Sequence, residues 1–335
     1  MVKLFIHSFG YRFHYRFKPG FGIFAFLDKA AELGFSGVNV SAFPPNFYTL
    51  NGAEPGHVRA IRNRVEANKL LIDIECNGTA PAHLTSMLDL AGRLGAGYLR
   101  TYVKPDVAET RQRIDDAVRD LSAIGPVAER AGIPLLLENH EDFTGPEMAE
   151  ILRRVGHPFI AALYDYGNSM VFMEEPLTTL EHMRPWIRSA HMKDHVTIPV
   201  GAAGNSEPIW LGVPLGEGFI PVVEATRRLV AAGVDRICYE NCWAYAAKYL
   251  GSRSDGTMGA GAFAYSRPPY DPAICVPNMP YQPPPGAPTI EEFVREHGLD
   301  AVALEAEANR RSIQWLKTEY AKAGIELAHE LNAAA

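Results

Sequence analysis

Four residues that could bind a metal ion each lie in or directly after a short apolar run of the sequence. They are Glu138 after LLL, Asp165 after ALY, His191 in RSAHMKD and Glu240 after ICY. A carboxylate beside a buried run needs a group that compensates its charge. Three carboxylates and one imidazole suit Mn²⁺ or Mg²⁺, with Co²⁺ or Zn²⁺ as alternatives. Taken singly, each residue could be a polar group at a loop edge, but together they predict a site for one divalent cation.

Such a site would support removal of a proton next to a carbonyl group. A divalent ion stabilises the enediolate that forms when the neighbouring C–H is deprotonated. A positioned carboxylate that accepts the proton contributes about 10²–10⁴-fold to the rate. Return of a proton to another carbon or another face gives isomerisation or epimerisation. A leaving group β to the carbanion gives elimination instead.

His140 bears on which of these reactions occurs. It lies two positions after Glu138 in ENH, so strand alternation would place both side chains on the same side. An imidazole titrates near neutral pH, which makes His140 a candidate base. The alternative is a histidine that only forms hydrogen bonds with substrate hydroxyls.

Other polar residues near the strand ends are candidates for binding substrate. They are His7, Glu75, Asn168, Lys193, His195 and Trp243. Trp243 could stack on a sugar ring or lie in the core. Glu75 could bind hydroxyls or form a salt bridge, and His7 could face the mouth or a packing layer. Lys193 and His195 could instead belong to a solvated turn.

The elements that must position these residues are short β-rich runs that alternate with helix-like segments. The expected strands are Leu4–Ser8, Gly37–Ser41, Leu70–Cys76, Tyr98–Val103, Pro134–His140, Ile160–Asp165, Arg188–Lys193 and Arg236–Cys242. Runs such as PLLLE are apolar without alternation, which is typical of parallel strands covered on both faces. Eight strand–helix units predict an α/β fold, the (β/α)8 TIM barrel, whose strand ends meet around one mouth.

We expect one barrel domain over residues 1–335 with two loop insertions. Residues 196–218 are rich in glycine and proline. The second insertion is residues 244–289, and nine of the chain's 25 prolines lie in its part from Pro268 to Pro288. Long loops after strands cover a site or contact another subunit. A helical tail over 289–331 should pack on the barrel through a stripe made of Leu304, Ala308, Ile313, Leu316 and Tyr320.

The charge, hydropathy and cysteine content of the chain bear on whether it binds nucleic acid or a membrane and on its compartment. A net charge of −7 argues against broad binding to nucleic acid, so we expect the stretch FGYRFHYRFKPGFGIF to be a first loop that lines the pocket. The sequence lacks an apolar run of about 20 residues and a signal-peptide pattern, which predicts no membrane partner. Four unevenly spaced cysteines are typical of a reducing compartment. We therefore expect a cytoplasmic protein.

The segments LLLENHEDFTG, LYDYGN, SAHMKDH and ICYEN resemble the xylose-isomerase-like barrel superfamily, in particular its sugar-phosphate isomerase/epimerase and ketose 3-epimerase branch. The resemblance implies that Glu138, Asp165, His191 and Glu240 bind the metal, and that Glu138 and Glu240 form an acid/base pair on opposite faces of the substrate. It also implies a small carbohydrate or glycoside substrate and a homo-oligomer. Ketose 3-epimerases usually have a histidine at the position of Asn168 and an arginine after the metal histidine, which argues against ketohexose 3-epimerisation itself.

Isomerisation or epimerisation of a sugar or keto-sugar is the leading prediction. The alternative is a lyase that cleaves 3-keto C-glycosides with His140 as base and a small second subunit, because relatives that deglycosylate these compounds resemble the chain at Glu138 and His140. A non-enzymatic sugar-binding barrel is a further alternative. An endonuclease on abasic DNA would need additional metal ligands and a basic groove, and the sequence shows neither.

Overall fold

The computed structural model describes residues 1–42, 50, 52–103, 109–198, 208–243, 245–251, 295–296, 298 and 300–333. Its centre is a closed barrel of parallel strands in the order β1, β10, β7, β6, β5, β4, β3, β2. The strands are β1 (Lys3–His7), β2 (Gly37–Ser41), β3 (Leu71–Glu75), β4 (Leu99–Thr101), β5 (Leu135–Glu138), β6 (Ile160–Asp165), β7 (Ile187–Met192) and β10 (Arg236–Tyr239). The predicted (β/α)8 barrel is confirmed.

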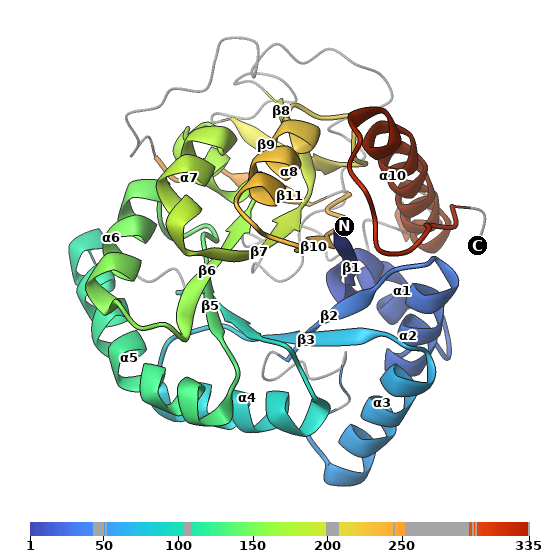
Figure 1. Ribbon diagram of the computed structural model, residues 1–335. Coiled ribbons are helices and arrows are strands. Elements are labelled where there is room, and N and C mark those ends of the chain that lie inside the picture. The colour runs from blue at the N-terminus through green and yellow to red at the C-terminus, as the bar shows by residue number, and fades with distance from the viewer. Residues whose placement is uncertain are drawn as a thin grey trace.

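Helices alternate with the strands and surround the barrel (Figure 1). They are α2 (Ile23–Glu32), α3 (Pro55–Ala67), α4 (Pro81–Leu94), α5 (Thr110–Ala131), α6 (Gly145–Val155), α7 (Pro176–Met183) and α8 (Val222–Ala231). The long helix α10 (Ala301–Ala323) packs against α1 (Arg12–Phe17) and α8. Short 3-10 helices are η1 (Ser8–Tyr11), η3 (Asn168–Phe172) and η4 (Arg184–Trp186). Glycines stop α4 and α5 because Gly95 and Gly132 adopt left-handed backbone angles, with φ of 74° and 68°.

Strand alternation separates the barrel interior from the core under the helices. Leu136 and Leu163 belong to a small interior cluster, whereas Leu135 and Leu137 belong to the large core between strands and helices. Interior side chains of such a barrel are stacked in layers. Two residues after Leu136 in β5, Glu138 points into the same interior, and the other inward positions at the strand ends are also polar. The fold therefore gathers these polar residues at one mouth.

Several predicted strands are too long at their C-terminal ends. β5 ends at Glu138 and β10 at Tyr239, because the chain leaves the parallel ladder there to begin the loops above the mouth. His140 therefore lies in a loop, and the prediction that strand alternation places it on the same side as Glu138 was wrong. Two strands, Gly37–Ser41 and Ile160–Asp165, were predicted with both ends correct.

Parts of the expected irregular loops have regular structure. β8 (Asp194–Ile198), β9 (Ile209–Val213) and β11 (Ala246–Lys248) form an antiparallel sheet in the order β11, β9, β8. Residues 196–218 thus contribute β9 and most of β8, and residues 244–289 contribute β11, where loop was expected. The first loop after β1 is likewise helical, with η1 and α1. Residues 252–289, which contain the proline-rich stretch, lie outside the described residues.

The tail helix is shorter than expected. It spans Ala301–Ala323, and residues 289–294 lie outside the described part of the chain. Of the predicted stripe, Ala308, Ile313, Leu316 and Tyr320 are buried, but Leu304 is 39% exposed. Leu304 was wrongly included, because its side of α10 faces away from the barrel.

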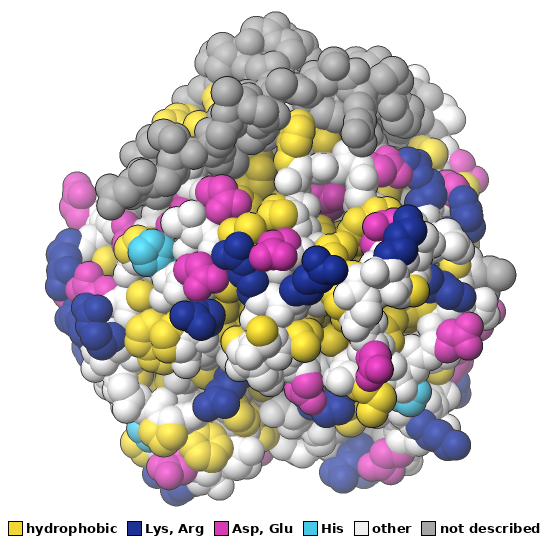
Figure 2. Space-filling model, turned by 45° about the horizontal axis from the view of Figure 1, so that its top comes forward, with side chains coloured by type: hydrophobic (Ala, Val, Ile, Leu, Met, Phe, Trp, Pro, Cys, Tyr) yellow, Lys and Arg dark blue, Asp and Glu magenta, His cyan; other side chains and the backbone are white. Residues whose placement is uncertain are grey.

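The outer surface mixes charges of both signs on the face shown in Figure 2. Ion pairs connect neighbouring helices, for example Arg154 Nη1 to Asp115 Oδ1 and Arg111 Nη1 to Glu150 Oε1, both 2.7 Å apart between α5 and α6. In the described residues, every helix is too short or too polar to traverse a bilayer. The cytoplasmic location, the homo-oligomer and the domain limits stay predictions.

Candidate active site

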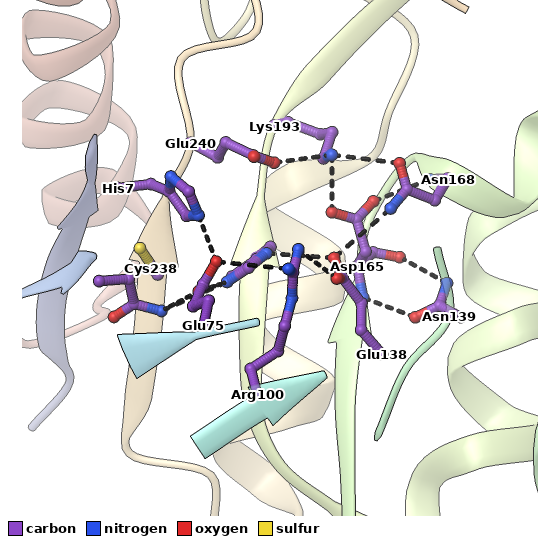
Figure 3. Close-up of polar contacts among 12 residues, drawn as sticks. His7, Glu75, Arg100, Glu138, Asn139, Asp165, Asn168, Lys193, Cys238 and Glu240 are labelled. Carbon is purple, nitrogen blue, oxygen red and sulfur yellow. Dashed lines mark hydrogen bonds and ion pairs between the residues drawn. The ribbon is translucent and has the colours of Figure 1, made fainter. Parts of the chain in front are cut away.

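The four predicted metal ligands lie at neighbouring strand ends of the barrel mouth. Glu138 and Asp165 end β5 and β6, His191 is in β7, and Glu240 directly follows β10. One potential ligand atom each from Glu138, Asp165 and His191 lies within 4.8 Å of the others. Glu240 is connected to Asp165 through Lys193, whose Nζ lies 2.8 Å from Asp165 Oδ2 and 2.7 Å from Glu240 Oε2 (Figure 3). The structure therefore brings all four residues to one place.

The two ring nitrogens of His191 face different carboxylates. Nε2 lies 2.8 Å from Glu75 Oε1, and Nδ1 lies 3.1 Å from Glu138 Oε1. If Nε2 donates its hydrogen to Glu75, the neutral ring directs the Nδ1 lone pair at Glu138. Two acceptors then face each other unless a proton or a metal cation lies between them. In the metal-free protein a proton fills this role: burial lowers the pKa of His191, but Glu75 and Glu138 outweigh it and raise the pKa to about 10.

His7 lies near a second group of potential ligand atoms, together with His191 and Glu240. Both of its ring nitrogens are already used. Nδ1 accepts the backbone N–H of Phe9 at 2.8 Å, and Nε2 lies 2.5 Å from Glu75 Oε2, to which it donates. His7 has no lone pair left for a cation. The set with Glu138 and Asp165 is therefore the better candidate for a metal site.

Glu75 is the centre of a buried polar network beneath these ligands. Besides the two histidines, its Oε1 accepts a hydrogen bond from Asn39 Nδ2 at 2.8 Å, and Arg100 Nη1 lies 3.6 Å from its Oε2. Burial raises the pKa of Glu75, but Arg100, His7 and His191 outweigh it and hold the pKa well below its usual range. These contacts match the salt-bridge interpretation of Glu75, and a contact with substrate stays a prediction.

Sequence reasoning missed Asn39 and Arg100. The Arg100 guanidinium also forms an ion pair through Nη2 with Glu138, and its side chain is only 4% exposed. The segment YLRTY could have indicated Arg100, because a charged residue there interrupts a predicted strand. The segment also contains Tyr98, Thr101 and Tyr102, so its polar character did not single out Arg100. Asn39 in GVNVS could have been found by the same rule that selected Glu75.

The carboxylates of the site differ in how readily they bind a proton. Burial raises the pKa of Glu138, but Arg100 and His191 outweigh it and lower the pKa to about 2. Burial likewise opposes ionisation of Glu240, and Lys193 and His7 outweigh it, so its pKa is well below the usual range. Burial raises the pKa of Asp165 to about 6 despite Lys193. Glu138 and Glu240 are therefore charged at neutral pH.

Three buried oxygen atoms of the site indicate that it suits a cation. Glu138 Oε2, Asp165 Oδ2 and Glu240 Oε2 receive no hydrogen bond of regular geometry, although Arg100 or Lys193 lies beside each. Buried polar atoms usually have such a partner. Carboxylate oxygens with one imidazole nitrogen are ligands that Mg²⁺, Mn²⁺ and related divalent ions accept. The residues present therefore fit the predicted ion.

His140 and Asn168 lie next to the ligands. The half-buried His140 ring stacks on Tyr102 at 4.0 Å between centroids, and its Nδ1 is buried without a hydrogen bond. Burial lowers the pKa of His140, with only partial compensation by Glu138. Asn168 Nδ2 lies 3.5 Å from Glu138 Oε1. Contact of either residue with a substrate stays a prediction.

His195 and Trp243 differ in their surroundings. His195 is buried, and neither ring nitrogen has a hydrogen-bond partner. Burial, helped by Lys193, lowers its pKa to about 3. The Trp243 ring packs edge-on against Phe13, with centroids 5.7 Å apart, and its carbonyl oxygen accepts a hydrogen bond from Arg12. Trp243 is half-buried, and both its place in the core and its stacking on a sugar stay predictions.

Comparisons with known proteins agree with this fold. A 3-oxo-isoapionate decarboxylase from Pectobacterium atrosepticum is 23% identical over 193 residues, which cover 58% of this chain and 68% of that protein. The crystal structure of D-psicose 3-epimerase from Clostridium cellulolyticum with D-tagatose has a TM-score of 0.60 at 14% identity and covers 97% of this chain and 99% of its own. A xylose isomerase-like barrel protein from Mycobacterium smegmatis in complex with magnesium has a TM-score of 0.56 at 18% identity, with 72% and 90% covered. The two structures share the fold with this chain.

The family model described as xylose isomerase-like TIM barrel matches residues 27–260, which is well over half of the chain. This range includes all four predicted ligands and seven of the eight barrel strands, β2 to β7 and β10. The chain belongs to the xylose isomerase-like TIM barrel family.

Proposed function

We propose that this chain is a divalent-metal-dependent enzyme that removes a proton next to a carbonyl group of a sugar or keto-sugar, as an isomerase or epimerase. The observation that carries the proposal is the orientation of His191, whose Nδ1 faces Glu138 while its Nε2 faces Glu75. The names of the structural neighbours, an epimerase and a magnesium-bound barrel of the same family, support the same chemistry.

The proposed ligands are Glu138, Asp165, His191 and Glu240. When bound, the ion would polarise a substrate oxygen and stabilise the negative charge that develops at the neighbouring carbon. Glu138 and Glu240 are ionised at neutral pH, so either can accept the substrate proton. They enter the mouth from β5 and β10, which are separated by β6 and β7. This separation supports a pair that exchanges protons with two sides of one substrate.

A second candidate reaction is elimination from a 3-keto C-glycoside with His140 as the base. It is favoured by the position of His140, which stacks on Tyr102 and whose lowered pKa keeps the ring uncharged at neutral pH. The relative named 3-oxo-isoapionate decarboxylase is compatible with related chemistry, because loss of CO₂ from a 3-oxo acid also leaves an enolate. The reactions share a carbanion and differ in the bond that breaks.

Incubation in D₂O distinguishes these reactions. The full chain is loaded with Mn²⁺ and mixed with a panel of ketoses and 3-keto-glycosides, and the products are analysed by NMR and mass spectrometry. Solvent deuterium in a rearranged sugar supports the isomerase or epimerase. Release of a free aglycone supports the lyase. A metal-loaded protein that exchanges no proton and forms no product with the whole panel, while still binding sugars, would indicate a binding protein instead.

A further inference from the structure

Lys193 lies between two of the proposed metal ligands. Its ammonium nitrogen is 2.8 Å from Asp165 Oδ2 and 2.7 Å from Glu240 Oε2, and it donates a hydrogen bond to Asn168 Oδ1 at 3.1 Å (Figure 3). The side chain is only 7% exposed. The ammonium nitrogen therefore lies near three oxygen atoms from different segments, two of them in ion pairs, and this arrangement resembles an oxygen-lined cation site.

We propose that the Lys193 ammonium group is the counter-cation of the metal-free site, and that a divalent ion must displace it in order to bind. The inference rests on the proposed function, since it concerns the same ligands. Asp165 and Glu240 are buried carboxylates that share one cation, and an uncompensated pair would repel. A Mg²⁺ ion takes oxygen ligands at about 2.0–2.1 Å. An ammonium group and such an ion compete for the same two oxygens, because their charges repel.

Arg100 does not have the same role, although it is also a buried cation next to a ligand. Arg100 contacts Glu138, but it also lies next to Glu75, which is not a proposed ligand. It can therefore keep a carboxylate partner when Glu138 binds metal. In the described part of the chain, both carboxylates paired with Lys193 are proposed ligands. Metal binding therefore deprives Lys193, but not Arg100, of its counter-charges.

A displaced ammonium group would stay inside the mouth. The backbone of Lys193 lies between β7 and β8, and both of these strands are fixed by hydrogen-bonded partners. The group would then be a free donor among buried residues, and a substrate oxygen could accept its hydrogen bond. This order of events gives Lys193 two successive partners, the ligand carboxylates before metal binding and the substrate after it.

Metal titration of the full chain tests the inference. Metal is removed by chelation, and Mn²⁺ binding is measured by calorimetry for the parent, Lys193→Met and Lys322→Met. Lys322 is an exposed residue of α10 that pairs with Glu319, so its variant is a control with the same change in net charge. Lys193→Met should bind Mn²⁺ with a Kd lower by roughly tenfold or more, because a competing charge is gone. Lys322→Met should match the parent. A Kd that is equal or higher in Lys193→Met would overturn the inference.

A second measurement needs no variant and remains informative if Lys193→Met does not fold. Crystal structures of the parent with and without Mn²⁺ should show that Lys193 Nζ leaves both Asp165 and Glu240 in the loaded form. An ammonium group that keeps both contacts beside the bound ion would overturn the inference and leave the proposed function intact. In contrast, Mn²⁺ binding by Lys193→Met together with full activity of a metal-free parent would support the inference and overturn the metal dependence. Failure of both proteins to bind Mn²⁺ would overturn both.

Discussion

The Nε2 nitrogen of His191 lies 2.8 Å from Oε1 of Glu75, and both side chains are completely buried. This contact fixes the orientation of the imidazole and leaves Nδ1 directed toward the other carboxylates of the site. Metal-binding histidines usually donate their second N–H to such an outer partner, which increases the basicity of the ligand nitrogen. We therefore propose that Glu75 orients a ligand of the site without being a ligand itself.

Replacement of Glu75 by Gln should weaken metal binding. The amide has a similar shape, but it has one acceptor oxygen and no charge, so it cannot accept from His7 and His191 through two carboxylate oxygens. Loss of an outer-shell partner typically lowers metal affinity about 10–100-fold. Calorimetric titration with Mn²⁺ checks this, with Glu66→Gln as the control because Glu66 is exposed on α3. Unchanged affinity in Glu75→Gln would show that the contact does not orient His191 for a metal.

Replacement of Glu138 or Glu240 by Gln should abolish most proton exchange between substrate and solvent. Each variant loses a charged carboxylate that could accept the proton, and general base catalysis contributes about 10²–10⁴-fold. Exchange is measured as deuterium incorporation at saturating Mn²⁺, so that weaker metal binding is compensated. If either variant exchanges protons at the parent rate, that carboxylate is not part of the acid/base pair.

Replacement of His140 by Phe separates the two candidate reactions. The phenyl ring can keep the stack on Tyr102 but has no basic nitrogen. An isomerase or epimerase that uses Glu138 and Glu240 should keep its exchange rate within about tenfold, whereas a lyase with His140 as base should lose about 10²–10⁴-fold. The measured quantities are deuterium incorporation and aglycone release under the same conditions. A large loss of exchange with ketoses would contradict the assignment of both proton transfers to the glutamates.

Much of the barrel could be predicted because most of its strands lie in apolar runs that end in polar residues. The same feature identified Glu138, Asp165 and Glu240. Arg100 was missed because β4 is only three residues long and lies in a run of mixed polarity. Its partners come from β3 and β5, so the contact depends on how the barrel closes and not on local spacing.

The small antiparallel sheet is a second feature that local patterns did not reveal. β9 pairs with β8 at Val213 and Asp194, and with β11 at Leu211 and Ala246. Strands this short are stable only when paired, so their formation depends on residues that are distant in the sequence. The prediction that His140 lies in a strand was wrong for a related reason. The end of β5 is determined by where its pairing with neighbouring strands stops.

His195 should make the folded protein sensitive to acid. Its folded pKa is about 3, mainly because of burial, whereas an unfolded histidine titrates near 6.5. Between these values the unfolded chain binds more protons, so the stability contribution is complete above pH 6.5 and is lost as the pH falls toward 3. Titration of this group should contribute up to about 1.4 kcal/mol per pH unit to the decrease in the free energy of unfolding.

Urea denaturation at pH 7, 6 and 5 checks the prediction for His195. The variant His195→Leu should show a smaller decrease over this range than the parent, because the leucine binds no proton. His329→Leu is the matched control, since His329 is exposed. An equal pH dependence in the parent and in His195→Leu would mean that His195 is not held neutral in the fold.

The metal content of the active protein is the most direct test of the proposed site. Elemental analysis of the purified chain, before and after chelation, is compared with its activity on the substrate identified in D₂O. We expect about one divalent ion per chain, loss of activity when this ion is removed, recovery with Mn²⁺ or Mg²⁺, and weak binding in Asp165→Asn. A preparation that is fully active without any divalent ion would contradict it.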